Sequence, residues 1–291
     1  MLKKLSPKAD RRPWIDAGVV LLLGASLWTW TCIARFPADG LGAIWGRGAL
    51  LLLAVFVVTR LFGLKGFFDL LFPILWLAAS PALRNLCGSD NVLYWIWALG
   101  VLLSTALVLA VKDARWLLAE IPLWAGMTFI MSASFVMPLA FLMRPAKPVR
   151  MFREAWKLPA LAGIAVLING ALAWRGRGFL QSGWLDVYDL LTIRHSFAFV
   201  LLALLGFFVM GRKGFSRQAF LQVFLVMAGW CLWPSPKGWG PAMDAMGVTF
   251  VWLAGPGLKV LRDELLDDSW HGRAVWAVLG TMLLLALFKG A

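Results

Sequence analysis

Charged side chains are scarce in this sequence. Only 15% of its 291 residues are Asp, Glu, Lys or Arg, whereas about 25% is usual for a soluble domain. Hydrophobic residues make up 61%, against roughly 45–50% in soluble proteins. A water-soluble chain of this length needs far more polar side chains to cover its surface. The composition therefore predicts a protein that is surrounded by lipid.

Residues that commonly build catalytic and metal centres are also few. The three cysteines, Cys32, Cys87 and Cys231, are far apart, so neither a disulfide framework nor a thiolate metal site is indicated. The two histidines, His195 and His271, give little support to a haem-binding bundle or a multi-histidine oxidase. The sequence has no glycine-rich phosphate loop and no His-Glu-x-x-His or Gly-x-Ser-x-Gly signature. We therefore predict no cofactor, and the sequence leans away from an enzyme.

Long apolar runs are what the chain has instead. Stretches such as 49–58 and 200–210 lack the alternation of a barrel strand. Because backbone amides in hydrocarbon must bond within helices or closed barrels, we predict an all-α fold, a polytopic transmembrane helical bundle of about 8–10 membrane segments. The candidate segments are residues 15–34, 44–63, 66–82, 92–111, 116–143, 158–174, 190–211, 217–234, 245–260 and 272–289.

The net charge of +13 comes from short basic clusters between these segments. This pattern is typical of the positive-inside bias of membrane proteins. The first cluster, within residues 1–13, precedes an apolar run at 15–33 that is too long and bulky for a cleaved signal peptide. We therefore predict a multi-pass protein of a bacterial-type inner (plasma) membrane with a cytoplasmic N-terminus. Membrane lipids are the expected partners, together with other subunits of a membrane complex or an oligomer of the same chain, and no nucleic acid is expected.

A basic stretch at 144–157 divides the chain almost in half. It is predicted to be a cytoplasmic linker between a first membrane half, 1–143, and a second membrane half, 158–291. Ordered matches favour two similar halves and hence an internal repeat. These matches pair Gly24-Ala25-x-x-Trp28 with Gly170-Ala171-x-x-Trp174, Lys65-Gly66-Phe67 with Lys213-Gly214-Phe215, Ser80-Pro81 with Ser235-Pro236, and Trp97 with Trp252.

Basic loops recur at equivalent positions of the two halves, which favours a parallel repeat over an inverted one. With both Met1 and Lys147 in the cytoplasm, a parallel repeat requires an even number of crossings in the first half. Five segments are predicted there. One segment must therefore turn back without crossing. It is either 66–82, which could be a kinked crossing or a re-entrant piece, or the long stretch 116–143. The sequence leaves both alternatives open.

Eighteen tryptophans are unusually many, and they cluster toward segment ends. Trp28, Trp30, Trp95 and Trp97 are examples. Indole rings favour the headgroup level, so we interpret these residues as an aromatic belt. An aromatic-lined binding path is the alternative.

Asp69 and Glu120 are the acids nearest to apolar surroundings. Ionisable groups at membrane depth are expensive unless paired or hydrated, so both are candidates for an ion or proton relay or a gate. In the repeat alignment Asp69 corresponds to Arg217, and a pseudo-twofold axis would bring these two residues together. The simpler interpretation, which we favour, is an interfacial acid whose charge lies among the headgroups.

Arg47 and Arg194 both lie near segment starts. An arginine there usually extends its side chain to the interface, although its planar guanidinium also suits an anionic substrate or a lipid phosphate. His195 follows Arg194, and together with nearby aspartates it could bind a phosphate or a metal. Adjacent residues on a helix point about 100° apart, so Arg194 and His195 do not make one site alone.

Three functions fit this pattern. The leading one is a multi-pass inner-membrane permease or transport subunit of unknown substrate, with two similar halves around a central path. The second is a non-catalytic membrane subunit that docks partners in a multiprotein complex. The third is an enzyme that acts on a lipid-linked substrate at the interface through Arg194 and His195.

Overall fold

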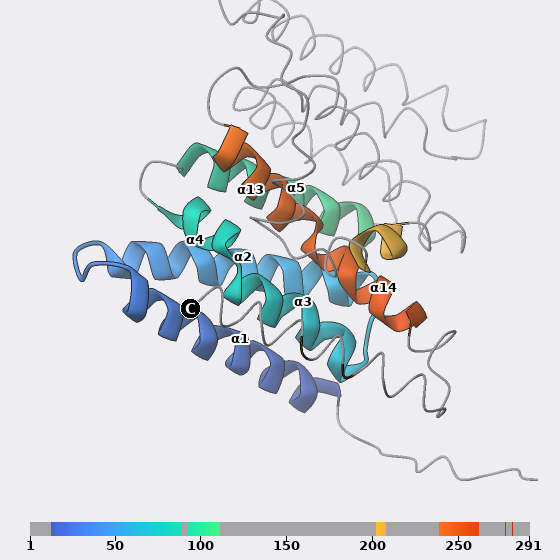
Figure 1. Cartoon of the computed structure of the whole chain (residues 1–291). Coiled ribbons are helices and arrows are strands. Elements are labelled where there is room, and N and C mark those ends of the chain that lie inside the picture. Colours follow the sequence, from blue (N-terminus) through green and yellow to red (C-terminus); the bar gives the residue numbers. More distant parts are fainter. Residues whose placement is uncertain are drawn as a thin grey trace, which may run out of the picture.

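The structure is a computed structural model, and it describes residues 13–88, 92–110, 202–207, 239–261, 277 and 281. These residues are helical except for short turns (Figure 1). The prediction of a helical protein is confirmed over these ranges. The predicted linker at 144–157 and the segments 116–143, 158–174 and 217–234 lie outside them.

Helix α1 (Pro13–Arg35) and helix α2 (Leu41–Leu61) are each long and apolar enough to cross a membrane. They confirm the helices predicted at 15–34 and 44–63. A short connection ends at Gly40, whose φ of 82° lies in the left-handed region that favours glycine.

Both faces of α1 are apolar. Val20 and Trp28 lie on its buried face, while Ile15, Leu22 and Ile33 lie at helical spacing on the opposite, exposed face. A helix at a water-facing surface carries polar residues on that side. The exposed apolar face therefore indicates that lipid, and not water, covers α1, as expected for a membrane protein.

The next segment of the chain is a broken helix. Helix α3 (Phe67–Ala79) and helix α4 (Pro81–Cys87) meet at Ser80 with a bend of 59°, and the two together are long and apolar enough for a third span. The break comes at Pro81, whereas α3 runs through Pro73. Proline disfavours helical backbone in the residue before it, and Ser80 has φ −72° and ψ 138°, which is extended backbone.

Helix α5 (Val92–Ala110) is continuous, as predicted for 92–111. The segment predicted at 245–260 is interrupted. It consists of α13 (Trp239–Phe250), a 3-10 turn η5 (Val251–Leu253) and α14 (Ala254–Val260). Its predicted counterpart in the repeat, α5, has no such interruption. The internal repeat stays a prediction.

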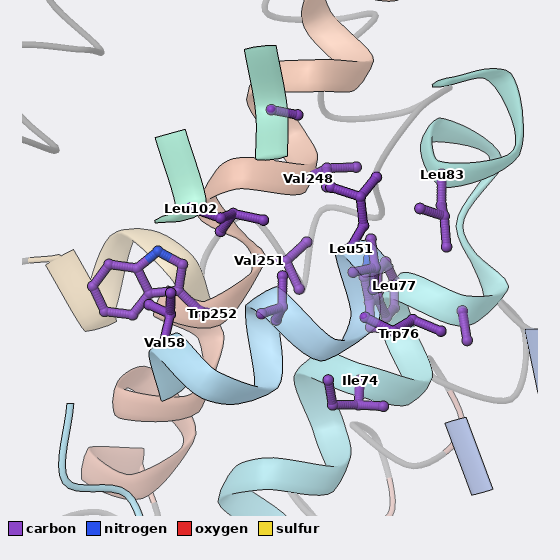
Figure 2. Close-up of a cluster of buried hydrophobic side chains, with 14 of the residues drawn as sticks. Leu51, Val58, Ile74, Trp76, Leu77, Leu83, Leu102, Val248, Val251 and Trp252 are labelled. Atoms are coloured by element: carbon purple, nitrogen blue, oxygen red, sulfur yellow. The ribbon is translucent and has the colours of Figure 1, made fainter. Parts of the chain in front are cut away.

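Helix α2 lies at the centre of the described bundle and packs against α1, α3, α4, α5 and η5. Figure 2 shows buried side chains of α2, α3, α4, α5, α13 and η5 in one cluster. Its members include Leu51 and Val58 of α2, Ile74 and Leu77 of α3, Leu83 of α4, Leu102 of α5, and Val251 and Trp252 of η5.

Tryptophan contributes to this core as well as to the surface. Trp28 and Trp97 are fully buried, so the belt interpretation is wrong for these two residues. The Trp28 Nε1–H donates to the carbonyl of Trp45 over 3.0 Å, which satisfies the indole inside the protein. Trp30 and Trp45 remain exposed, as a belt requires. A position near a segment end gives depth in the bilayer, but it does not say which way the side chain points.

Residues 202–207 are helical and cross the second broken segment at very close range. A Cβ atom on Gly206 would meet the carbonyl of Leu253, and one on Gly257 would meet the carbonyl of Leu202. Small residues at such crossings let helix backbones touch, which is the usual way that membrane helices pack.

Candidate functional site

Two interrupted segments lie side by side in this structure. Helix α4 packs against α13, and α3 packs against α14, so the two segments run in opposite directions (Figure 1). Irregular backbone at membrane depth is tolerated only where protein buries it or where it lines a water-filled cavity. Ser80 and residues 251–253 are all buried, so the protein shelters both breaks. We take this pair of broken segments as the candidate site.

Ser80 supplies the hydrogen bonds at the first break. Its Oγ donates to the carbonyl of Leu77 over 3.0 Å and accepts from the backbone N–H of Leu83 over 3.1 Å. The hydroxyl thereby completes the end of α3 and caps the start of α4. Pro81 occupies the first position of α4, where its missing N–H leaves no helical bond unmade.

Asp69 lies at one end of the pair, in the first turn of α3. Only 2% of its surface is exposed, so the side chain lies inside the protein. Pro73 has no N–H to donate to the Asp69 carbonyl, which precedes it by one helical turn. The backbone of Gly255 approaches that carbonyl, and a Cβ on Gly255 would come within 2.8 Å of it. Asp69 is therefore at the contact of α3 with α14.

A second buried acid, Asp244, lies at the other end, on α13. The Asn85 Nδ2 of α4 donates to its Oδ2 over 3.2 Å. Sequence reasoning missed this pair because the predicted membrane segment started at 245, which left Asp244 in a loop. A usable signal was present, since Asp244 is the only ionisable residue in the whole run 239–258.

Arg47 has a definite partner in the fold. Its Nη1 donates to the carbonyls of Cys87 and Gly88 over 3.0 and 3.2 Å. A cation at a helix C-terminus satisfies carbonyls that have no helical donor and interacts favourably with the helix dipole. The Trp95 Nε1–H of α5 donates in turn to the Arg47 carbonyl over 3.0 Å. The arginine thus joins α2, α4 and α5, a role that neither sequence interpretation included.

The structure brings Asp69 and Arg47 into the same bundle, at opposite ends of the α3–α4 segment. The other residues selected from the sequence are Glu120, Arg194, His195 and Arg217, and their placement lies beyond the described ranges. The proposed Asp69–Arg217 pair therefore stays a prediction.

No group of three or more His, Cys, Asp or Glu side chains that could hold a metal ion occurs within the described residues. The chemistry that these residues do offer is that of two buried carboxyls, Asp69 and Asp244, with the amide of Asn85 donating to the second. Comparison with known proteins gives no match for the chain among family models, curated proteins or solved structures.

Proposed function

We propose that this protein is a multi-pass membrane permease or transport subunit in which the two broken segments border the path of the solute. The observation that carries the proposal is the antiparallel pair of interrupted segments, with a buried carboxyl, Asp69 or Asp244, at each end. Interrupted helices near the middle of the bilayer are a recurrent feature of secondary transporters, because unwound backbone and helix ends bind substrates and ions there.

The burial of the two acids supports the same function. Asp69 is 2% exposed and Asp244 is 1% exposed, although both lie in apolar segments. Ionisable groups inside a membrane bundle are costly and usually mark ion or substrate pathways. Ser80, the polar residue at the break of the first segment, is also buried.

The experiment uses the full chain reconstituted in liposomes and a panel of radiolabelled solutes covering sugars, amino acids, nucleosides and organic anions. We expect at least one solute to enter faster than into protein-free liposomes. Asp69→Asn and Asp244→Asn should reduce that rate, because each removes a charge from the path. Asp39→Asn is the matched control, since Asp39 is exposed in the turn before α2.

Uptake equal to that of protein-free liposomes for every solute would contradict the proposal. So would a transported solute whose rate is the same in wild type, Asp69→Asn and Asp244→Asn.

A further inference from the structure

Arg60, in the last turn of α2, has a guanidinium that is incompletely bonded. Its Nη1 is buried, and none of the described residues forms a hydrogen bond with that atom. Neither Asp16 of α1 nor Asp69 of α3, the described acids at this end of the bundle, bonds to it. A buried polar group without a partner costs free energy, and a charged one costs more. An acceptor from outside the described residues would remove this cost.

The backbone that ends α2 already binds the carbonyls that a cation at a helix end commonly uses. Gly63 has a φ of 93°, and this left-handed glycine folds the chain back over the end of the helix. The backbone N–H groups of Phe62, Gly63 and Leu64 donate to the carbonyls of Val58, Arg60 and Thr59 over 2.9, 3.0 and 3.4 Å. Arg60 therefore differs from Arg47, which binds two carbonyls at the end of α4.

Lys65 adds a second positive charge close to Arg60. It is exposed and directly follows Leu64, whose N–H bonds to the last turn of α2. Lys259 of α14 belongs to the same end of the bundle. It is exposed and lies one helical turn beyond Gly255, where a Cβ would be 2.8 Å from the Leu64 side chain. This end of the bundle therefore attracts an anion.

An apolar strip leads along α2 to Arg60. Leu50, Leu53 and Val57 share one helical face with Arg60, and they are 49%, 46% and 39% exposed. Residues 50 and 60 are separated by about 15 Å of helical rise, which is half of a hydrocarbon core of about 30 Å. The strip thus has the depth of one leaflet. An acyl chain that lies along it would bring a lipid headgroup to Arg60, whereas a phosphate ion in water has no use for it.

We propose that Arg60 and Lys65 bind the phosphate of an anionic phospholipid whose acyl chains lie along Leu50, Leu53 and Val57. The planar guanidinium can bind two phosphate oxygens, and the ammonium adds a second charge. A zwitterionic lipid fits less well, because its own cation would meet Lys65.

The predicted topology agrees with an anionic lipid. With a cytoplasmic N-terminus, the end of α2 lies at the cytoplasmic leaflet, whose surface is negatively charged. This lipid site does not depend on the proposed transport function.

The test is native mass spectrometry of the full chain, purified in a mild detergent and mixed with phosphatidylglycerol or phosphatidylcholine of the same acyl chains. We expect the wild type to bind phosphatidylglycerol more tightly. Arg60→Ala should weaken that binding about fivefold, which is the contribution of one cation near an anionic lipid surface. Binding of phosphatidylcholine should stay the same. Arg35→Ala is the matched control, since Arg35 is exposed in the last turn of α1 at the opposite end of the bundle.

Lys65→Gln keeps the test decisive if Arg60→Ala fails to fold. It changes an exposed residue of the turn and should cause a similar loss of affinity for phosphatidylglycerol. Equal affinities of the wild type for the two lipids would overturn the inference. So would equal affinities of the wild type, Arg60→Ala and Lys65→Gln for phosphatidylglycerol.

Inorganic phosphate distinguishes a lipid from a soluble phosphate at the same residues. Added in large excess over the lipid, it should leave the bound phosphatidylglycerol in place, because it has no acyl chain for the strip on α2. Displacement of the lipid by inorganic phosphate would assign the cations to a soluble anion and contradict the proposal.

Discussion

At the scale of single residues, several polar side chains of the described bundle bond to the backbone of their own helix. The hydroxyls of Thr29, Thr31, Thr59 and Thr105 each donate to the carbonyl four residues earlier in their own helix. In hydrocarbon there is no water to accept such a bond, so the helix itself provides the acceptor. Arg47 follows the same rule over a longer distance in sequence.

Replacement of Arg47 tests its role in joining α2 to α4. Arg47→Ala should lower the stability by about 2 kcal/mol, because bonds from a charged donor to two carbonyls are lost. The stability of Arg47→Lys should lie between those of the wild type and Arg47→Ala, since lysine keeps the charge without the planar guanidinium. The measurement is the thermal unfolding midpoint in one detergent.

Lys65→Ala is the control for Arg47, because Lys65 is exposed in the turn between α2 and α3. Its midpoint should stay close to that of the wild type. A midpoint for Arg47→Ala equal to that of Lys65→Ala would show that the bonds to Cys87 and Gly88 add no stability.

The sequence could place Arg47 near a segment start but could not identify its partner. The carbonyls that it binds belong to residues 40 and 41 positions later, and composition does not encode that contact. Asp69 was selected because an acid in an apolar run is conspicuous. Asp244 was missed because the predicted segment began at 245, six residues after the start of α13 at Trp239, and boundaries are the least reliable part of such a prediction.

At the scale of elements, the continuous apolar helices were predictable and the breaks were only partly so. The ends of α1, α2 and α5 fall within a few residues of the predicted ones, because apolar length alone sets them. Pro73 and Pro81 both suggested irregularity in the third segment, but only Pro81 breaks the helix. Ser80 accounts for the difference, since its hydroxyl supplies the hydrogen bonds that a break requires.

Gly255 tests the close contact between the broken segments. Gly255→Ala should lower the stability by about 1–3 kcal/mol, because the new Cβ meets the Asp69 carbonyl and forces α14 away from α3. Thermal unfolding in detergent measures the change, and loss of solute uptake would show that the contact also matters for function.

Gly46→Ala is the matched control for Gly255, as Gly46 lies in α2 with open space around it. Alanine is the better helix former, so this variant should be as stable as the wild type or slightly more stable. Equal stabilities of Gly255→Ala and Gly46→Ala would mean that α14 and α3 are less tightly packed than the structure shows.

At the scale of the whole molecule, the contacts of α4 show where the third segment ends. Helix α3 starts just after α2 ends, whereas the end of α4 is bound by Arg47 near the start of α2. Residues 47 and 61 are separated by about 21 Å of helical rise. Helices α3 and α4 together therefore extend along most of the length of α2. We therefore expect the α3–α4 segment to cross the membrane and not to turn back.

A crossing at α3–α4 bears on the two alternatives that the sequence left open. With a cytoplasmic N-terminus, α1, α2, α3–α4 and α5 make an even number of crossings and return the chain to the cytoplasm before Lys112. The linker at 144–157 is predicted to be cytoplasmic too. Of the two alternatives, we therefore expect that 116–143, which lies outside the described residues, is the one that turns back without crossing.

The most direct measurement is the accessibility of single cysteines at three connections of the chain. In a background with Cys32, Cys87 and Cys231 replaced by Ala, the variants are Asp39→Cys, Lys65→Cys and Ser89→Cys. A thiol reagent that cannot cross membranes is applied to intact cells and to permeabilised cells. We predict that positions 39 and 89 are labelled in intact cells and that position 65 is labelled only after permeabilisation. Labelling of positions 65 and 89 from the same side would contradict the account, because the broken helix would then turn back instead of crossing.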